Sequence, residues 1–102
     1  MKQSVSVSDW EQVANVACEV ANAMMRHNPS LYASKHKHLM SLLDSLESKY
    51  GERAMITATR GEFPVDPFEA KKCLERALEL ARVEGDSEVE IEILDSLRHL
   101  DL

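Results

Sequence analysis

The chain has 102 residues, of which 44% are apolar and 29% are charged, and its formal net charge is −6. This composition excludes an intrinsically disordered polypeptide, and we expect one domain over residues 1–102 with its own apolar core and a disordered tip over about residues 1–7. Because no apolar run approaches the roughly 20 residues that a bilayer-spanning helix needs, and residues 1–8 lack the apolar stretch of a secretory signal, we expect a cytoplasmic protein that does not associate with a membrane.

The first predicted helix begins at Asp9, because Ser8 opens a Ser-x-x-Glu capping box. Its apolar residues recur at intervals of three and four, as on one face of an α-helix. The residues of this stripe are Trp10, Val13, Ala14, Ala17, Ala21 and Met24. Val16, Val20 and Met25 widen the stripe, so we expect the helix to be covered from more than one side. The helix should end at Asn28-Pro29, since the residue before a proline disfavours helical geometry.

The second predicted helix runs from about Pro29 to Tyr50 and ends at Gly51, the residue type most common just after a helix. The next segment, Glu52–Arg60, is ambiguous because Met55–Thr59 contains β-branched residues that are common in strands. No second strand is available to pair with it, and a lone strand leaves its backbone groups without partners. We therefore predict a short helix that ends near Gly61.

The next predicted helix has a clear start and a clear end. Asp66-Pro67 places a capping side chain before a proline at the first helical position, and Gly85 follows the last helical residue. The final segment, Ser87–Leu100, alternates like a strand between Glu88 and Ile93, but its longer three-to-four period predicts a helix. The buried stripe expected on that helix is Val89, Ile93, Leu97 and Leu100. The sequence thus predicts an all-α protein of five helices, one of them short.

A spacing of small and large residues, Ala70-x3-Leu74-x2-Ala77-Leu78, is echoed 31 residues upstream by Leu39-x3-Leu43-x2-Leu46. Together with Trp10-x2-Val13-Ala14-x2-Ala17, which is similar to a degenerate first helix of a repeat, this pattern resembles the tetratricopeptide repeat family. The resemblance implies antiparallel helical hairpins stacked in sequence order around a groove that binds a peptide or a partner helix. The glycine and tyrosine typical of the first repeat helix are missing, and an irregular four- or five-helix bundle is the alternative.

No pattern in the sequence predicts a catalytic or metal centre. His36 and His38 are two residues apart, which on a helix directs them about 200° from each other. Cys18 and Cys73 fall inside apolar helical patterns, where we expect buried free thiols, and no Cys-x-x-Cys or His-Glu-x-x-His motif occurs. The serines lack a Gly-x-Ser-x-Gly turn. We therefore expect no cofactor, no metal ion and no enzymatic activity.

The net charge is concentrated at the C-terminal end. Residues 1–83 hold 11 acidic and 11 basic residues, whereas residues 84–102 hold seven acidic residues and a single basic one, Arg98. The predicted acidic patch consists of Glu88, Glu90, Glu92 and Asp95. Acidic residues early in a helix favour its dipole and keep a terminal repeat soluble, or they contact a basic surface of a partner protein. The same charge argues against nucleic-acid binding.

Three functional hypotheses fit these observations. The leading one is a protein–protein interaction module, because helical hairpins commonly bind peptides or helices. Its candidate contact residues are Gln12, Asn15, Glu19, Asn22, Thr57 and Arg60. The second is a small acidic inhibitor, such as an immunity protein or antitoxin, whose acidic patch blocks a basic enzyme. The third is a structural homo-oligomer, for example a homodimer, in which the five methionines and the wide apolar face of the first helix form a self-interface.

Overall fold

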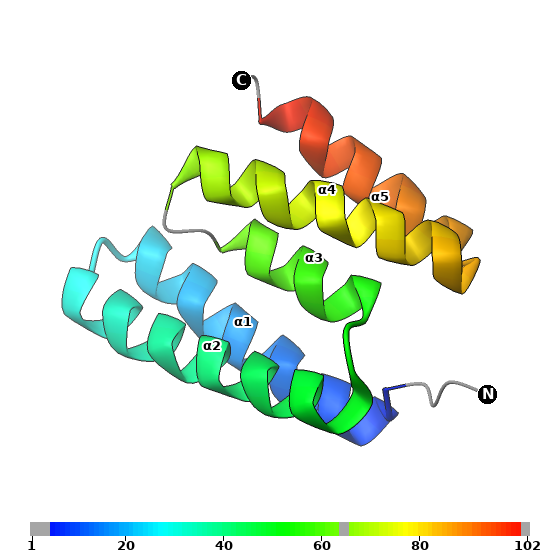
Figure 1. Ribbon diagram of the computed structural model, residues 1–102. Coiled ribbons are helices and arrows are strands. Elements are labelled where there is room, and N and C mark those ends of the chain that lie inside the picture. Colours follow the sequence, from blue (N-terminus) through cyan, green and yellow to red (C-terminus); the bar gives the residue numbers. More distant parts are fainter. Residues whose placement is uncertain (1–4, 64–65, 101–102) are drawn as a thin grey trace. The chain divides into compact units, whose positions relative to one another are not determined.

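The computed structural model describes residues 5–63 and 66–100. Within them the chain forms helices and no strand (Figure 1). The helices are α1 (Val7–Met25), α2 (Pro29–Tyr50), α3 (Ala54–Glu62), α4 (Pro67–Glu84) and α5 (Ser87–His99). The predicted all-α class, with five helices of which one is short, is therefore confirmed. Most of the disordered tip predicted over residues 1–7, namely residues 1–4, lies outside the described residues.

The chain divides into two compact units, Met1–Gly51 and Glu52–Leu102, which we call unit 1 and unit 2. Unit 1 is a helical hairpin in which α1 packs against α2. In unit 2, α4 packs against both α3 and α5 (Figure 1). The single domain expected over residues 1–102 stays a prediction.

The buried residues of unit 1 form one apolar stripe on each helix. On α1 these are Val13, Val16, Val20 and Ala23, and on α2 they are Leu39, Leu43 and Leu46. The predicted stripe is wrong at Ala14, Met24 and Met25, which are exposed. Alanines and valines share the three-to-four spacing on adjoining sides of α1, and the spacing alone does not say which side is covered. Because valines bury more apolar surface than alanines, the valine side becomes the core.

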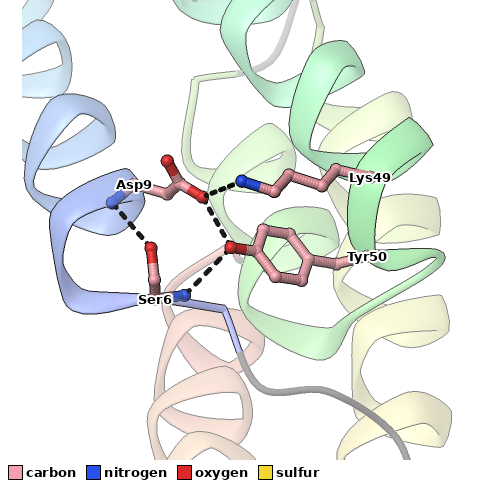
Figure 2. A network of polar contacts seen from close by, with 4 residues as sticks. All are labelled: Ser6, Asp9, Lys49 and Tyr50. Carbon is pink, nitrogen blue, oxygen red and sulfur yellow. Dashed lines mark hydrogen bonds and ion pairs between the residues drawn. The ribbon is translucent and has the colours of Figure 1, made fainter.

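Helix α1 begins earlier than predicted because its N-cap is Ser6 and not Ser8. The Ser6 hydroxyl oxygen accepts a hydrogen bond from the Asp9 backbone N–H at 3.1 Å (Figure 2). The Ser6 backbone N–H in turn donates to the Tyr50 hydroxyl oxygen at 3.3 Å. Tyr50 is the last residue of α2, so a contact between the two helices favours Ser6 over the equally suitable Ser8.

The Asp9 carboxylate joins the start of α1 to the end of α2. Its Oδ2 accepts a hydrogen bond from the Tyr50 hydroxyl at 2.5 Å and another from Lys49 Nζ at 3.0 Å (Figure 2). These two bonds, that of Tyr50 first, hold the pKa of Asp9 below its ordinary value of 3.8. The carboxylate also raises the pKa of Lys49 above 10.5. Both shifts show that the network favours the ionised pair.

We expect the stability of unit 1 to decrease as the pH falls below 3.8 and to decrease less in an Asp9→Asn variant. A carboxyl whose pKa is lowered by folding stabilises the fold above its unfolded-state pKa, and this stabilisation is lost as the pH falls through the folded-state pKa. Thermal unfolding followed by the fluorescence of Trp10, the only tryptophan, measures the change in α1. The control is Glu11→Gln, at an exposed position two residues away. Equal acid sensitivity of wild type and Asp9→Asn would contradict the prediction.

Both ends of α2 are as predicted, whereas α1 ends at Met25 and not at Asn28-Pro29. The Asn28 side chain accepts a hydrogen bond from the Leu31 backbone N–H at 3.1 Å, and Pro29 occupies the first turn of α2. At the other end Gly51 has φ +83°, and its N–H donates to the Glu47 carbonyl oxygen at 2.8 Å. These caps use only neighbouring residues, which is why the sequence predicts both bounds of α2.

Unit 2 has a core of small and large residues from three helices. Ala54 and Ala58 of α3, Leu74, Ala77, Leu80 and Ala81 of α4, and Ile93 of α5 are buried there. Gly61, predicted near the end of α3, is helical, and its role is close packing. A Cβ atom at Gly61 would lie 2.9 Å from Leu74 Cγ and 3.3 Å from the Ala70 carbonyl oxygen. The absence of a side chain therefore lets α3 approach α4 closely.

Carboxylates cap the starts of two helices of unit 2, α3 and α5. The Ala54 N–H at the start of α3 donates to Glu84 Oε2 at 2.9 Å, while the preceding Arg53 makes no side-chain cap bond. Helix α5 is capped by Asp86, whose side chain accepts a hydrogen bond from the Val89 N–H at 3.2 Å. A carboxylate that is distant in sequence thus replaces a local N-cap for α3.

The helical prediction for the last segment is confirmed. Ile93 is 2% exposed, and Val89, Leu97 and Leu100 pack against the core of unit 2. Ile91, which would share a face with Ile93 in a strand, is 66% exposed. The tertiary packing therefore follows the helical period.

Candidate functional site

The four contact residues predicted on α1 are exposed, and two of them line a hollow. Glu19 and Asn22 border a shallow hollow of about 150 Å³ together with Ala23, Arg26, Leu31 and Lys35, whereas Gln12 and Asn15 lie outside its lining. Lys35 Nζ lies 2.7 Å from Glu19 Oε2 and holds the pKa of Glu19 below its ordinary value. Because the two side chains pair with each other, they close this hollow from one side.

The other two predicted contact residues belong to unit 2. Thr57 and Arg60 lie on α3, where Thr57 is 8% exposed and Arg60 is half-buried. The six residues are thus divided between two helices of different units. The polar residues predicted on α1 are exposed to a partner, whereas Thr57 is not.

The predicted acidic patch lies on α5, and its members differ in their surroundings. Glu90 is half-buried and 3.7 Å from Arg82 Nε of α4, and Asp95 bonds to Arg98 Nη2 at 2.6 Å. Glu88 and Glu92 are exposed. Two of the four carboxylates therefore face basic groups of the same unit, and the acidic character of the surface rests on Glu88 and Glu92.

A larger hollow, which we call the turn hollow, lies where α1 turns into α2. It has a volume of about 440 Å³ and is lined by Ala23, Met24, His27, Asn28, Pro29 and Tyr32. Met24 is 53% exposed at its edge, and the adjacent Met25, which does not line it, is 77% exposed. Both hollows share Ala23, whose neighbours Asn22 and Met24 diverge to opposite sides of α1. The sequence analysis missed the turn hollow because it assigned Met24 to the buried stripe. Two consecutive methionines before a turn are the signal that could have revealed it.

The backbone of the turn hollow is held in an uncommon conformation. His27 has φ +52° and is the only non-glycine residue with positive φ among the described residues. Its N–H donates to the Met24 carbonyl oxygen at 3.1 Å, and the Asn28 N–H donates to the Ala23 carbonyl oxygen at 3.1 Å. This pair of bonds is the Schellman motif, whose left-handed residue is usually glycine. A histidine there costs stability, which points to a role of its side chain in the hollow.

The corresponding position after α4 has the usual residue. Gly85, with φ +73°, donates to the Arg82 carbonyl oxygen at 3.3 Å, and Asp86 donates to the Ala81 carbonyl oxygen at 3.0 Å. The hydrogen-bond pattern is the same as at His27, so the two turns form a matched pair. They differ in the residue with positive φ, which is a histidine after α1 and a glycine after α4.

We expect a His27→Gly variant to be more stable than wild type by about 1 kcal/mol, because glycine adopts positive φ without the strain of a Cβ atom. The reverse change, Gly85→His, should destabilise the chain by a similar amount, since nothing lies within 4 Å of a Cβ atom there and only backbone strain is added. Urea unfolding followed by helical circular dichroism measures both. A His27→Gly variant of lower stability would contradict the prediction.

The surroundings of the turn hollow are basic although the chain is acidic overall. Residues 20–43 contain no aspartate or glutamate, but they contain three basic residues and three of the four histidines. Lys35 is paired with Glu19, while Arg26 and Lys37 are exposed. His36 stacks on Tyr32 with ring centroids 5.7 Å apart. None of Lys35, Arg26 and Lys37 lines the turn hollow, and Arg26 and Lys35 line the smaller hollow, but all three lie in the same carboxylate-free segment as the turn hollow.

The described residues offer little for catalysis or metal binding. No group of three or more histidine, cysteine, aspartate or glutamate side chains within residues 5–63 and 66–100 is arranged to hold a metal ion. Both cysteines are free thiols, and the prediction that both are buried is wrong, because Cys18 is exposed and Cys73 is half-buried. Burial, with the nearby Glu69 carboxylate, raises the pKa of Cys73, which disfavours its reactive thiolate. None of the described helices has the length and apolar content needed to cross a bilayer.

Comparison of the chain with protein families, curated proteins and solved structures finds no significant match.

Proposed function

We propose that this protein is a non-enzymatic protein–protein interaction module, and that its turn hollow binds an acidic amphipathic helix or peptide of a partner protein. The observation that carries the proposal is an apolar hollow of about 440 Å³ that lies within the carboxylate-free segment 20–43 of a chain whose net charge is −6. An apolar side chain of the partner would enter the hollow, and its acidic residues would be attracted to the carboxylate-free segment 20–43, which carries Arg26 and Lys37. Such an attraction gives a faster encounter.

The lining favours a peptide over a small metabolite. Small-molecule sites orient their ligand by several convergent polar groups, whereas the polar side chains of this lining are His27, Asn28 and the Tyr32 hydroxyl. The Oδ1 atom of the Asn28 side chain already accepts a hydrogen bond from the Leu31 N–H. The flexible thioether of Met24 suits varied apolar side chains, as methionines do in other peptide-binding surfaces. Exposed apolar surface of this kind is typical of interaction sites.

The tetratricopeptide-like architecture is part of the same proposal. Its support is local: Ala70, Leu74 and Ala77 are buried along α4, as the resemblance requires, and Gly85 leads directly into α5. We propose a cytoplasmic location because the thiol of Cys18 is exposed and free, which is compatible with a reducing compartment.

The test compares two adjacent methionines of α1. Displayed random peptides are selected on the full-length protein, and the affinities of the enriched peptides are then measured with Met24→Gln and Met25→Gln variants. We expect enriched peptides with an apolar residue beside acidic ones. Met24→Gln should weaken their binding about tenfold or more, and Met25→Gln by less than about twofold, because only Met24 lines the hollow. Equal affinity of both variants for the peptides would refute the proposal. Circular dichroism checks that both variants fold.

A further inference from the structure

Of the polar side chains that line the turn hollow, that of His27 is open to a ligand. The other two are Asn28 and Tyr32. Asn28 Oδ1 caps the start of α2, and the Tyr32 ring stacks on His36. His27 is exposed, and its side chain has no hydrogen bond, ion pair or ring contact with any residue of 5–63 and 66–100. Its ring nitrogens are therefore accessible to a bound group.

The turn itself does not require a histidine at this position. The turn after α4 is closed by the same two hydrogen bonds and has glycine, Gly85, as its residue with positive φ. At His27, φ is +52°, a conformation that is strained for a residue with a Cβ atom. Within the described chain no contact of the His27 side chain offsets this strain. Strain of this kind is typical of residues that act on a ligand.

We infer that His27 is the specificity-determining residue of the turn hollow, and that its imidazole donates a hydrogen bond to a carboxylate of the bound peptide. The inference rests on the proposed function and names the chemical group that the hollow recognises. An apolar side chain next to that carboxylate in the peptide would contact Met24 and Pro29 in the lining. The hollow would thus recognise an acidic residue and an apolar one together.

A carboxylate fits His27 better than the other common polar groups do. A carboxylate only accepts hydrogen bonds, and an imidazole has an N–H to donate in both of its protonation states. When the imidazole is protonated the bond is charge-assisted and about twice as strong as a neutral one, which a hydroxyl or an amide of the peptide would not match. Residues 20–43 contain no aspartate or glutamate, so no carboxylate of that segment competes for His27.

Three variants of His27 separate the strain of the turn from the contact with the peptide. His27→Gly removes both the strained Cβ atom and the donor, and His27→Ala removes the donor but keeps the Cβ atom. His27→Gln keeps the Cβ atom and supplies an amide N–H donor. If His27 contacts the peptide, affinity follows the presence of the donor. If His27 serves only the turn, affinity follows stability.

The experiment measures the affinities of the enriched peptides for the full-length variants by calorimetry, and the stabilities of the same variants by urea unfolding. We expect His27→Gly and His27→Ala to bind about tenfold or more weakly than wild type, although the glycine variant is the more stable of the two, and His27→Gln to bind within about threefold of wild type. Each acidic residue of the peptide is then replaced in turn by its amide. One such change should weaken binding to wild type about tenfold and to His27→Ala less than about twofold.

The control is His38→Ala, at an exposed histidine of the same segment that does not line the turn hollow, and it should bind the peptides as wild type does. Affinities that follow stability, or amide changes that act equally on wild type and His27→Ala, would overturn the inference. If Met24→Gln weakens binding and His27→Ala does not, the inference fails and the proposed function stands. If no peptide is enriched, or the peptides do not depend on Met24, the proposed function fails and the inference with it.

Discussion

Replacement of Leu74 by alanine is expected to lower the free energy of unfolding of unit 2 by about 2–5 kcal/mol. Leu74 is 2% exposed and belongs to the cluster that joins α3, α4 and α5. Its truncation removes apolar contacts and leaves a cavity that the surrounding alanines are too short to fill. Amide hydrogen exchange of α3, α4 and α5 measures the loss of stability. Urea unfolding of wild type and variant, followed by circular dichroism, gives a second measurement of the same change.

The neighbouring Gly61 gives this prediction an internal check. A Gly61→Ala change alone should destabilise unit 2 by about 1–3 kcal/mol, because the new methyl group collides with Leu74 Cγ and this cost exceeds the roughly 0.5–1 kcal/mol gained in helix propensity. In the double variant the methyl group enters space that Leu74 has vacated. The two effects should therefore be less than additive, by about 0.5–3 kcal/mol. Strict additivity would show that the two residues are not in contact.

Replacement of Ile93 by alanine is expected to cost about 2–5 kcal/mol, whereas the same change at Ile91 should alter stability by less than about 0.5 kcal/mol. Ile93 is 2% exposed and Ile91 is 66% exposed, although they are two residues apart and chemically identical. Urea unfolding of both variants, measured in parallel, gives the difference directly.

The contrast between these two isoleucines also discriminates between helix and strand. In a strand Val89, Ile91 and Ile93 would share one face, and truncation of Ile91 and Ile93 would have similar effects. In a helix they point about 200° apart, so only one of them reaches the core. Similar losses of stability in the Ile91→Ala and Ile93→Ala variants would contradict the helical packing of α5.

The sequence predicts best those features that depend on neighbouring residues. Both ends of α2, the start of α4 and the turn at Gly85 match, because Asn28, Asp66 and Gly85 act on backbone groups within a few residues. The stripe of α5 is also correct, since a helical period over a long segment outweighs a short alternation. For these elements the free energy that decides the structure is local.

The features that the sequence analysis missed depend on distant residues. The start of α1 is selected by Tyr50 from the end of α2, and the start of α3 is capped by Glu84 from the end of α4. The role of Gly61 follows from the position of Leu74. Of the candidate site, the sequence indicated Glu19 and Asn22 beside the smaller hollow, but it placed Met24 in the core, where its side chain does not lie.

The sequence by itself determined that this protein is built of five helices, where most of them end, and that its net negative charge is concentrated at the C-terminal end. Helix caps, the period of apolar residues and charge are properties of short stretches of chain, so they can be predicted without knowledge of the fold. Only the tertiary structure decided which side of α1 is buried and that Met24, His27 and Tyr32 surround a hollow. The side of a helix that is covered depends on the free energy of packing against another helix, and that energy is set by residues far away in the sequence.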